Sequence, residues 1–335
     1  MPGPGDVLID VQASGVNYAD THQTEDSYLA KQTLPLIPGA EVVGRIHGGE
    51  RAGQRVLALL NGGGGYAERA VAKEALVYPL DDDVTDAQAL ALLVQGTTAW
   101  HLLRTSTHFA PGETVVVHSA AGGVGTIAVQ LAKAWGAGRI IGTASGAEKC
   151  ALAESLGADI ALDISQTETA EQVTEALRDA NGGRPVDIVL EMTGGHVFDG
   201  SLAALRPLGR LAVFGMASRK PPAPIQVASL MARSRSVAGF WLMHALGLPG
   251  GLGAPLEELT SMIRAHRLSV ITGGSYPLAE AGKAHEELRS RRSIGKLILT
   301  VAGAEPTVPD WAIVDEAHEP TAAQLSAVES FGSAS

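Results

Sequence analysis

The hydrophobic positions in the first part of the chain fall into short runs. Segments with β-branched and alternating apolar residues are VLIDVQASGV (7–16), EVVGRI (41–46) and RVLALL (55–60). Glycine and proline clusters separate these runs, as in PLIPG, HGGERAGQ and NGGGG. Short strands joined by such turns predict an antiparallel, barrel-like and mostly β domain over residues 1–96.

From Thr97 the pattern changes to strands that alternate with helices. The strand-like runs are TVVVHS, RIIGTAS, ADIALD, VDIVLEM and RLAVFG, with helical segments such as IAVQLAKAWG and TAEQVTEALRDA between them. This alternation is typical of βαβ units and a parallel sheet. We therefore expect an α/β fold whose doubly wound parallel sheet occupies residues 97–235.

After residue 235 the alternation becomes less regular. PLEELTSMIRAHR and PLAEAGKAHEEL have a helical pattern, and GKLILTVAG resembles a final strand. We expect residues 236–335 to return to the first domain and to end in a tail over residues 302–335.

Composition and charge restrict the class of protein. The net charge of −11 makes a nucleic acid an unlikely partner. The single cysteine, Cys150, excludes a disulfide framework and a four-cysteine zinc site within one chain. No apolar run approaches the length of a membrane span, and no signal-peptide pattern opens the chain. The sequence predicts a soluble, cytoplasmic protein that binds neither nucleic acid nor membrane.

The segment VVVHSAAGGVG, residues 115–125, has the context of a dinucleotide-binding turn. A buried-type strand leads into a turn of small residues, and the next segment has apolar residues at helical spacing. A helix N-terminus offers free N–H groups to a pyrophosphate, Gly122 lets the backbone approach it, and Gly125 allows close packing of helix on strand. Ala120 departs from the usual fingerprint, because it stands where the first glycine is expected. The alternative is a packing turn in another doubly wound fold.

AAGGVG after VVVHS resembles the medium-chain dehydrogenase/reductase superfamily, and within it the zinc-independent quinone oxidoreductase group that includes ζ-crystallin. The resemblance extends from PGPGDVLIDVQASGVNYAD to RRSIGKLIL, through PLIPGAEVVGRI, GGYAERAV, LLVQGTTAWHLL and VDIVLEMTGG. It implies a GroES-like catalytic domain, an NADP-binding Rossmann domain and an active site in the cleft between them.

The resemblance also bears on zinc. Zinc-dependent relatives have a cysteine where this chain has Asn17, and a histidine where it has Ala40 beside Glu41. A catalytic zinc needs three protein ligands, and these two positions cannot supply them. We therefore expect no bound metal.

The cofactor is predicted from the end of the second Rossmann strand. NAD-specific domains carry an acidic residue there, whereas this strand ends in IIGTAS. Ser145 and Lys149 match family residues that bind the 2′-phosphate, which favours NADPH over NADH. Ile164 and Ser165 depart from the Tyr-Arg pair that many members have, and Lys149 alone could be an ordinary helix lysine. The residues that we expect at the cofactor are Thr98, Ala121, Gly122, Gly123, Val124, Gly125, Ser145, Lys149, Gly215 and Lys296.

The candidate catalytic residues lie in the first domain. Without a metal, hydride addition to a conjugated acceptor needs a hydrogen-bond donor near the oxygen that gains charge. Asn17 resembles the family asparagine beside the nicotinamide, and Tyr28 matches a tyrosine in some members' active sites. Tyr18 and Tyr66 are further hydroxyl donors, although each could equally be a half-buried packing residue.

Three functions remain open from the sequence. The first is an NADPH-dependent reductase of quinones or α,β-unsaturated carbonyls, and the second is an enoyl-thioester reductase of a biosynthetic pathway. The third is a low-turnover NADPH-binding protein, as among the lens crystallins of this family.

Two further expectations come from the resemblance. SVAGFWL (236–242) matches the strand through which members commonly dimerise, so we expect a homodimer. The tail segment DWAIVDEAHEPTAAQLSAVESF (310–331) resembles the hairpin with which relatives begin. The tail could replace that hairpin, or it could be a loosely docked extension.

Overall fold

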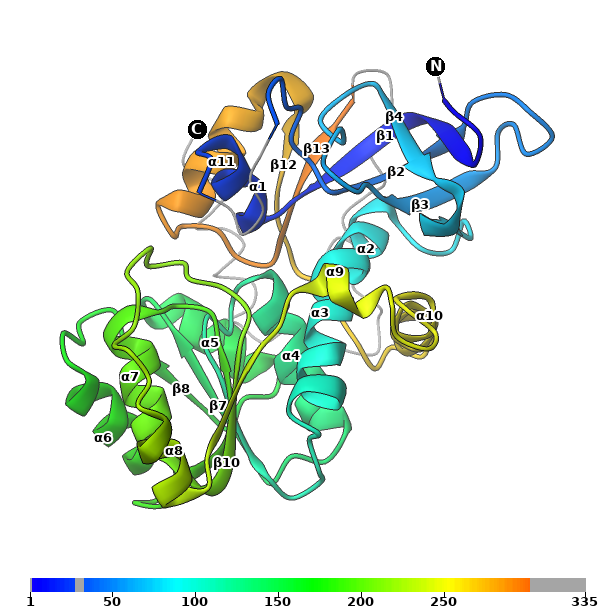
Figure 1. Ribbon diagram of the computed structural model, residues 1–335. Coiled ribbons are helices and arrows are strands. Elements are labelled where there is room, and N and C mark those ends of the chain that lie inside the picture. The colour runs from blue at the N-terminus through cyan, green and yellow to red at the C-terminus, as the bar shows by residue number, and fades with distance from the viewer. Residues whose placement is uncertain (1, 28–32, 302–335) are drawn as a thin grey trace. The chain divides into compact units, whose positions relative to one another are not determined.

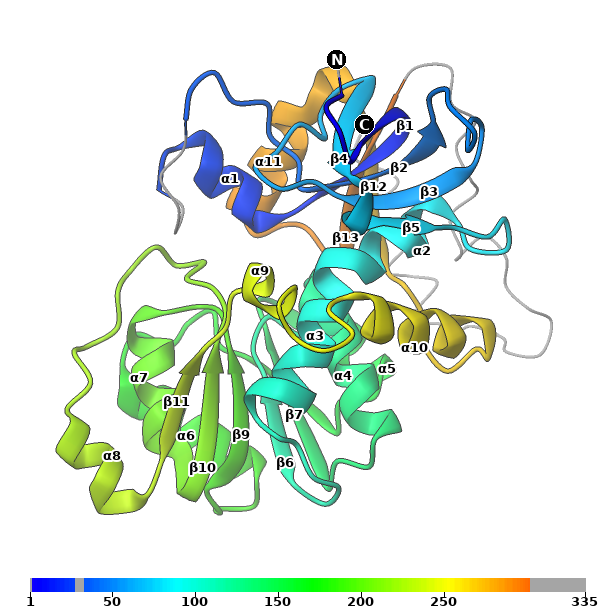
Figure 2. The same cartoon turned by 45° about the vertical axis from the view of Figure 1, so that its right-hand side comes forward.

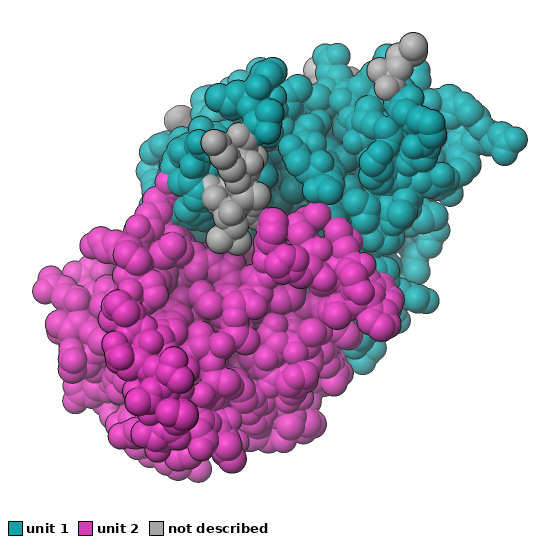
Figure 3. Space-filling view, in the orientation of Figure 1, with its two compact units in different colours: residues 1–97, 252–313 teal, residues 98–251, 314–335 magenta. Residues whose placement is uncertain are grey.

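The computed structural model describes residues 2–27 and 33–301. Tyr28 and the tail over residues 302–335 therefore lie outside the described residues, and the predictions made for them remain predictions. The described chain divides into two compact units (Figure 3). The first unit contains the chain up to Thr97 and the described residues from Leu252, and the second contains Thr98–Gly251.

A mostly antiparallel sheet forms the centre of the first unit. Its strands, in chain order, are β1 (Asp6–Val16), β2 (Glu41–Ile46), β3 (Arg55–Leu59), β4 (Arg69–Lys73), β5 (Val77–Pro79), β12 (Thr272–Pro277) and β13 (Lys296–Thr300). Neighbours follow the order β12-β13-β1-β2-β3-β5, and β4 pairs with the first half of β1 (Figure 1). Along β1, Ile9, Val11 and Ala13 alternate into the core, as the period of two residues in a strand requires.

Helices join and cover this sheet. They are α1 (Tyr18–Thr24), η1 (Glu74–Leu76), α2 (Asp86–Leu90), η2 (Ala91–Gly96), α10 (Gly253–Arg264), η4 (Leu278–Glu280) and α11 (Ala281–Arg289). Thr85 begins α2 as its N-cap, and its side chain accepts a hydrogen bond from the Gln88 N–H. The next six residues, η2, are π-helical, which shifts the backbone hydrogen bonds by one residue.

The second unit is built on a parallel sheet. Its strands are β6 (Thr114–Val117), β7 (Arg139–Ala144), β8 (Ile160–Asp163), β9 (Val186–Glu191), β10 (Leu205–Val213) and β11 (Ser236–Gly239), and they lie in the order β11-β10-β9-β6-β7-β8. The order reverses at β6, which is the arrangement of a doubly wound, dinucleotide-binding sheet. The α/β fold that the sequence predicted is thereby confirmed.

Helices cover both faces of this sheet (Figure 2). The helices from residue 97 to residue 245 are α3 (Thr97–His101), η3 (Leu102–Ser106), α4 (Gly123–Ala134), α5 (Ala147–Ser155), α6 (Ala170–Ala180), α7 (Gly195–Ala204), α8 (Val227–Arg233) and α9 (Leu242–Ala245). Right-handed crossovers that run in opposite directions from the centre put α4 and α5 on one face and α6 and α7 on the other. Val173 and Leu177 of α6 pack on Val116 and Val189 of the sheet.

The boundary after the parallel sheet differs from the predicted one. The sequence placed the return to the first domain at residue 236, but Ser236–Gly239 pairs with β10 and belongs to the second unit. The change of unit comes at Gly251–Leu252. The strand is only four residues long, and the alternation of strands and helices is less regular after it, so the pattern did not mark where the sheet ends.

Candidate functional site

A buried ion pair lies at the centre of the first unit. Lys296 begins β13, Glu41 begins β2, and Lys296 Nζ lies 2.5 Å from Glu41 Oε1 with both side chains fully buried. The other carboxylate oxygen, Glu41 Oε2, accepts the backbone N–H of Val94 at 3.0 Å. Val94 lies in the π-helical η2, so an irregular helical turn directs its N–H to a side chain of another element.

Gly15 makes room for this carboxylate. A Cβ atom at position 15 would lie 2.4 Å from Glu41 Oε1, which is far inside van der Waals contact. Residue 15 of β1 must therefore be glycine for Glu41 to lie against that strand. The SGVN segment thus carries a packing requirement as well as the candidate residue Asn17.

Asn17 is held by three side chains of this cluster. Its Oδ1 accepts hydrogen bonds from Lys296 Nζ at 3.1 Å and from Gln95 Nε2 at 3.3 Å, and its Nδ2 donates to Glu41 Oε1 at 2.7 Å. A side-chain amide has two N–H groups, so one N–H of Asn17 makes no hydrogen bond within the described residues. The cluster thereby fixes the orientation of the amide and leaves one donor for a ligand.

Two further oxygens in the cluster are buried without a hydrogen-bond partner in the described part of the chain. They are Gln95 Oε1 and Asp20 Oδ1. Burial raises the pKa of Asp20 to about 6, against the opposing effect of its hydrogen bond from the Asn17 backbone. The sequence analysis did not single out Asp20, although Asn17 and Asp20 have the spacing of a capping box. It also missed Gln95, which only the fold brings to Asn17.

The candidate tyrosines have different surroundings. Tyr66 is half-buried, its hydroxyl donates to Asp20 Oδ2 at 3.0 Å, and burial raises the pKa of that hydroxyl well above its usual value. Tyr18 begins α1, and its ring makes an edge contact with the ring of His22. The hydroxyl proton of Tyr66 is therefore already used in a hydrogen bond within the first unit. Tyr28 lies outside the described residues.

The donor set around Asn17 does not suit zinc. An amide stands at position 17, a methyl group stands at Ala40, and the ammonium of Lys296 is in direct contact with the carboxylate of Glu41. Zinc takes thiolate, imidazole and free carboxylate ligands, and a lysine ammonium excludes a second cation from the same oxygen. Within residues 2–27 and 33–301, no group of three His, Cys, Asp or Glu side chains is placed to hold a metal ion.

The predicted cofactor residues of the second unit lie at one edge of its sheet. Ala121–Gly125 follow β6, Ser145 follows β7 and Gly215 follows β10. The carboxyl ends of parallel strands meet at the same edge, and in doubly wound sheets ligands bind there, at the point where the strand order reverses. Segments that are far apart in the sequence are therefore brought to one place by the sheet order.

The turn after β6 can exist only with a glycine at its end. A Cβ at Gly125 would lie 2.1 Å from the carbonyl oxygen of Ser119, which itself has a positive φ of 53°. Gly122 is the N-cap of α4 and carries no side chain over the first turn. The turn thus has the open backbone that a pyrophosphate needs at a helix N-terminus. It fits a bound dinucleotide, and Ala120 is accommodated because it is fully buried under the turn.

The segment after β7 carries the residues that we predict to distinguish the two nicotinamide cofactors. Ser145 is half-buried, and Lys149 lies in the first turn of α5. Asp163 at the end of β8 has its pKa lowered by hydrogen bonds from Ser165 and also from the backbone of Gly146. A carboxylate therefore lies next to the segment that contains Ser145, which the sequence pattern did not reveal.

Two buried titratable groups stabilise this edge. Glu191 ends β9, and its Oε1 accepts the N–H groups of Thr193 at 2.7 Å and Gly194 at 3.0 Å. Burial raises the pKa of Glu191 to about 7. His118 is bonded to Thr143 Oγ1 and Ser201 Oγ, both at 2.7 Å, and burial lowers its pKa to about 4. His118 is therefore neutral at physiological pH and joins three elements below the turn.

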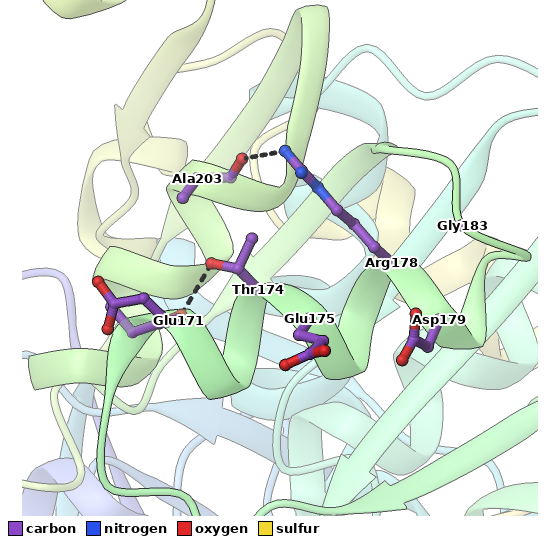
Figure 4. Close-up of a pocket in the computed structure, with 8 residues that line it drawn as sticks. Glu171, Thr174, Glu175, Arg178, Asp179, Gly183 and Ala203 are labelled. Atoms are coloured by element: carbon purple, nitrogen blue, oxygen red, sulfur yellow. Dashed lines mark hydrogen bonds between the residues drawn. The ribbon is translucent and has the colours of Figure 1, made fainter.

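The remaining predicted cofactor residues lie in different units. Thr98 is a buried residue of α3 in the second unit. Lys296 lies in the first unit, where its ammonium bonds Glu41 and Asn17. A hollow on the second unit, along the outer side of α6, lies elsewhere: its lining includes Glu171, Thr174, Glu175, Arg178 and Asp179 (Figure 4). It contains none of the sequence-predicted residues.

Comparison with protein families matches both units. Residues 3–82 match the alcohol dehydrogenase GroES-like domain, and residues 123–252 match the zinc-binding dehydrogenase family. The second match begins at α4 and includes the strands β7 to β11 of the parallel sheet, and it does not include positions 17 and 40.

Individual relatives match nearly the whole chain. A quinone oxidoreductase of Pseudomonas aeruginosa is 34% identical over 89% of this chain and 92% of its own length. A 2-haloacrylate reductase of a Burkholderia species is 32% identical over 89% of this chain and 91% of its own. A mycobacterial protein solved in complex with NADPH superposes with a TM-score of 0.82 at 37% identity, covering 90% of this chain and 92% of that one. No helix in the described part of this chain is long and apolar enough to cross a membrane.

The buried ion pair gives the first prediction. Lys296→Met leaves the carboxylate of Glu41 buried without its cation, so we expect the free energy of unfolding to fall by roughly 3–5 kcal/mol. Adding Glu41→Gln to this variant removes the unpaired charge and should restore part of the loss. Chemical denaturation measures both values.

An exposed pair provides the matched control. Lys283 lies 2.9 Å from Glu280 at the surface, so Lys283→Met should change the free energy of unfolding by less than about 1 kcal/mol. For the buried pair, the coupling would be contradicted if Lys296→Met and Glu41→Gln together lowered the free energy of unfolding by the sum of their separate effects.

Proposed function

The chain belongs to the quinone oxidoreductase group of the medium-chain dehydrogenase/reductase family, and from this we propose that it is an NADPH-dependent reductase of quinones or α,β-unsaturated carbonyls. The observation that carries the proposal is the buried amide of Asn17, which is held by Lys296, Glu41 and Gln95 and has one N–H without a partner among the described residues.

The role of Asn17 follows from where charge develops in such a reaction. NADPH, when bound, would supply the hydride for such a reaction, and the acceptor oxygen would gain negative charge. We assign the free N–H of Asn17 to that oxygen, because a donor that is already oriented stabilises charge without reorganising. The Lys296 ammonium contacts Asn17 Oδ1 and polarises the amide toward stronger donation. No metal is needed for this stabilisation, and we propose that the protein works without zinc.

The binding of NADPH is assigned to the sheet edge of the second unit. Ala121, Gly122, Gly123, Val124 and Gly125 offer the pyrophosphate an open backbone at the start of α4, with Thr98 and Gly215 as further contacts of the cofactor. Ser145 and Lys149 are assigned to the 2′-phosphate, because a hydroxyl and an ammonium are its natural partners. The NADPH-bound mycobacterial relative supports this choice of cofactor.

Association is the remaining element of the proposal. In the described residues β11 pairs with β10 alone, so the other side of Ser236–Gly239 presents unpaired backbone groups. We propose a homodimer in which two copies of β11 pair about a two-fold axis.

An acceptor panel tests the function. We expect NADPH oxidation with quinones or enones, unchanged by a chelator, and a loss of about 100-fold in kcat/KM in Asn17→Ala, because one donor to the oxygen is removed. Asn181→Ala is the control. Asn181 is also a buried asparagine, but among the described residues its side chain bonds the backbone of Arg184 and Pro185 and the side chain of Thr114. Turnover restricted to enoyl thioesters would favour the thioester reductase, and tight NADPH binding without turnover would favour a binding protein.

Cofactor selectivity gives an independent prediction. Lys149→Ala should raise the Kd of NADPH roughly tenfold, the value of one charge-assisted hydrogen bond, and leave the Kd of NADH unchanged. Asp163→Asn should lower the Kd of NADPH, because it removes a carboxylate next to Gly146 that would repel the 2′-phosphate. Titration of both cofactors into the three proteins measures these constants, and equal affinities in the unmodified protein would refute the assignment.

The dimer is tested by light scattering at micromolar concentration. The expected mass is twice the 34.5 kDa of one chain. A species with the mass of a single chain would contradict the pairing of β11.

A further inference from the structure

Three side chains from separate elements form a hydrogen-bonded chain that ends at Asn17. The hydroxyl of Tyr66 lies 3.0 Å from Asp20 Oδ2 and 3.0 Å from His285 Nε2. Asp20 lies in α1 and is fully buried, Tyr66 precedes β4, and His285 is a buried residue of α11. The same oxygen, Asp20 Oδ2, accepts the backbone N–H of Asn17 at 2.8 Å.

The donors in this chain can be ordered. An ionised carboxylate only accepts hydrogen bonds, so the single proton of the Tyr66 hydroxyl points to Asp20. His285 Nε2 must then carry a proton and donate it to the Tyr66 oxygen. Burial lowers the pKa of His285, with a smaller contribution from Arg289, which favours the neutral ring, and the bond to Tyr66 selects the tautomer with the proton on Nε2.

We propose that His285, Tyr66 and Asp20 are positioning residues that act together to hold Asn17 in its working orientation. The inference rests on the proposed function only in taking Asn17 as the donor to the acceptor oxygen. Asn17 is the N-cap of α1 with an extended backbone (φ −123°, ψ 152°), and its N–H bond to Asp20 fixes the direction in which its side chain leaves that backbone. The cluster around Lys296 then orients the amide at the other end of the same side chain.

The charge of Asp20 controls the strength of this hold. Hydrogen bonds to an ionised carboxylate are about twice as strong as bonds to a neutral one. Lys296 of β13 lowers the pKa of Asp20 and Glu41 of β2 raises it, while burial is the largest effect and brings it to about 6. Tyr66 donates directly, and His285 is one bond further away.

The sign of the pH effect follows from these bonds. Above pH 6 the carboxylate is ionised and holds both N–H and O–H donors firmly. Below pH 6 a proton on the unpartnered Oδ1 leaves the two bonds in place but weakens them. Asn17 is therefore held less firmly in acid, and kcat/KM should fall as the pH drops through about 6.

Two variants separate this role from simple packing. In the unmodified protein, kcat/KM should fall about tenfold between pH 7 and pH 5. Asp20→Asn keeps an oxygen acceptor but never ionises, so its kcat/KM should not show this acidic limb, the decrease between pH 7 and pH 5. Tyr66→Phe removes one donor from the anion, so the midpoint of the limb should move to higher pH. Glu25→Gln is the control: it breaks the exposed contact of α1 with Arg289 of α11 and should leave the midpoint unchanged.

A second readout does not depend on turnover. The NMR signals of the Asn17 side-chain amide should titrate with a midpoint near pH 6 in the unmodified protein, with a higher midpoint in Tyr66→Phe, and not at all in Asp20→Asn. If no acceptor is reduced, the proposed function fails and these signals alone decide the positioning role. An Asn17 signal that is independent of pH, an unmoved midpoint in Tyr66→Phe, or a titrating amide beside a flat kcat/KM profile would each overturn the proposal.

Discussion

The ion pair between Lys296 and Glu41 determines the arrangement of the candidate site. Removing two charges from water costs several kcal/mol for each ion, and only close contact with further hydrogen bonds offsets that cost. Glu41 obtains these bonds from the Asn17 amide and the Val94 N–H, and Lys296 obtains one from Asn17 Oδ1. The pair therefore brings β2, β13, η2 and the start of α1 to one point.

The same reasoning explains how polar groups are held in the interior of the first unit. Each charged or amide group in the cluster is oriented by a neighbour whose own orientation is fixed. Within residues 2–27 and 33–301, Gln95 Oε1 and Asp20 Oδ1 are the oxygens of this cluster that have no hydrogen-bond partner. Buried polar groups without a partner are costly, so they indicate either a bound ligand or a group whose protonation changes. In this cluster burial raises the pKa of Asp20 to about 6, and our proposals give Asp20 a change of protonation and Asn17 a bound ligand.

Sequence reasoning predicted the architecture well because the architecture depends on local periodicity. The strands from β6 to β10 and the glycine turn after β6 could be identified from consecutive residues, and the sheet order agrees with the expected fold. It named Asn17, Tyr66 and Lys296 as separate candidates, but it did not predict the bonds that join them, and it missed Asp20 and His285. Asp20, Tyr66 and His285 are separated by 46 and 219 residues along the chain, and only the tertiary fold brings them together. Gln95 was missed because η2 departs from regular helical spacing.

Gly15 has a consequence for how this sequence can vary. Glu41 fills the space where a Cβ atom of residue 15 would lie, so substitutions at positions 15 and 41 depend on each other. If residue 41 had a shorter side chain, position 15 would no longer need to be glycine. If residue 15 gained a larger side chain first, that side chain would displace the Glu41 carboxylate and leave the Lys296 ammonium buried without its partner. Among natural homologues, these two positions should therefore covary, and the order of substitution should be loss of the glutamate before loss of the glycine.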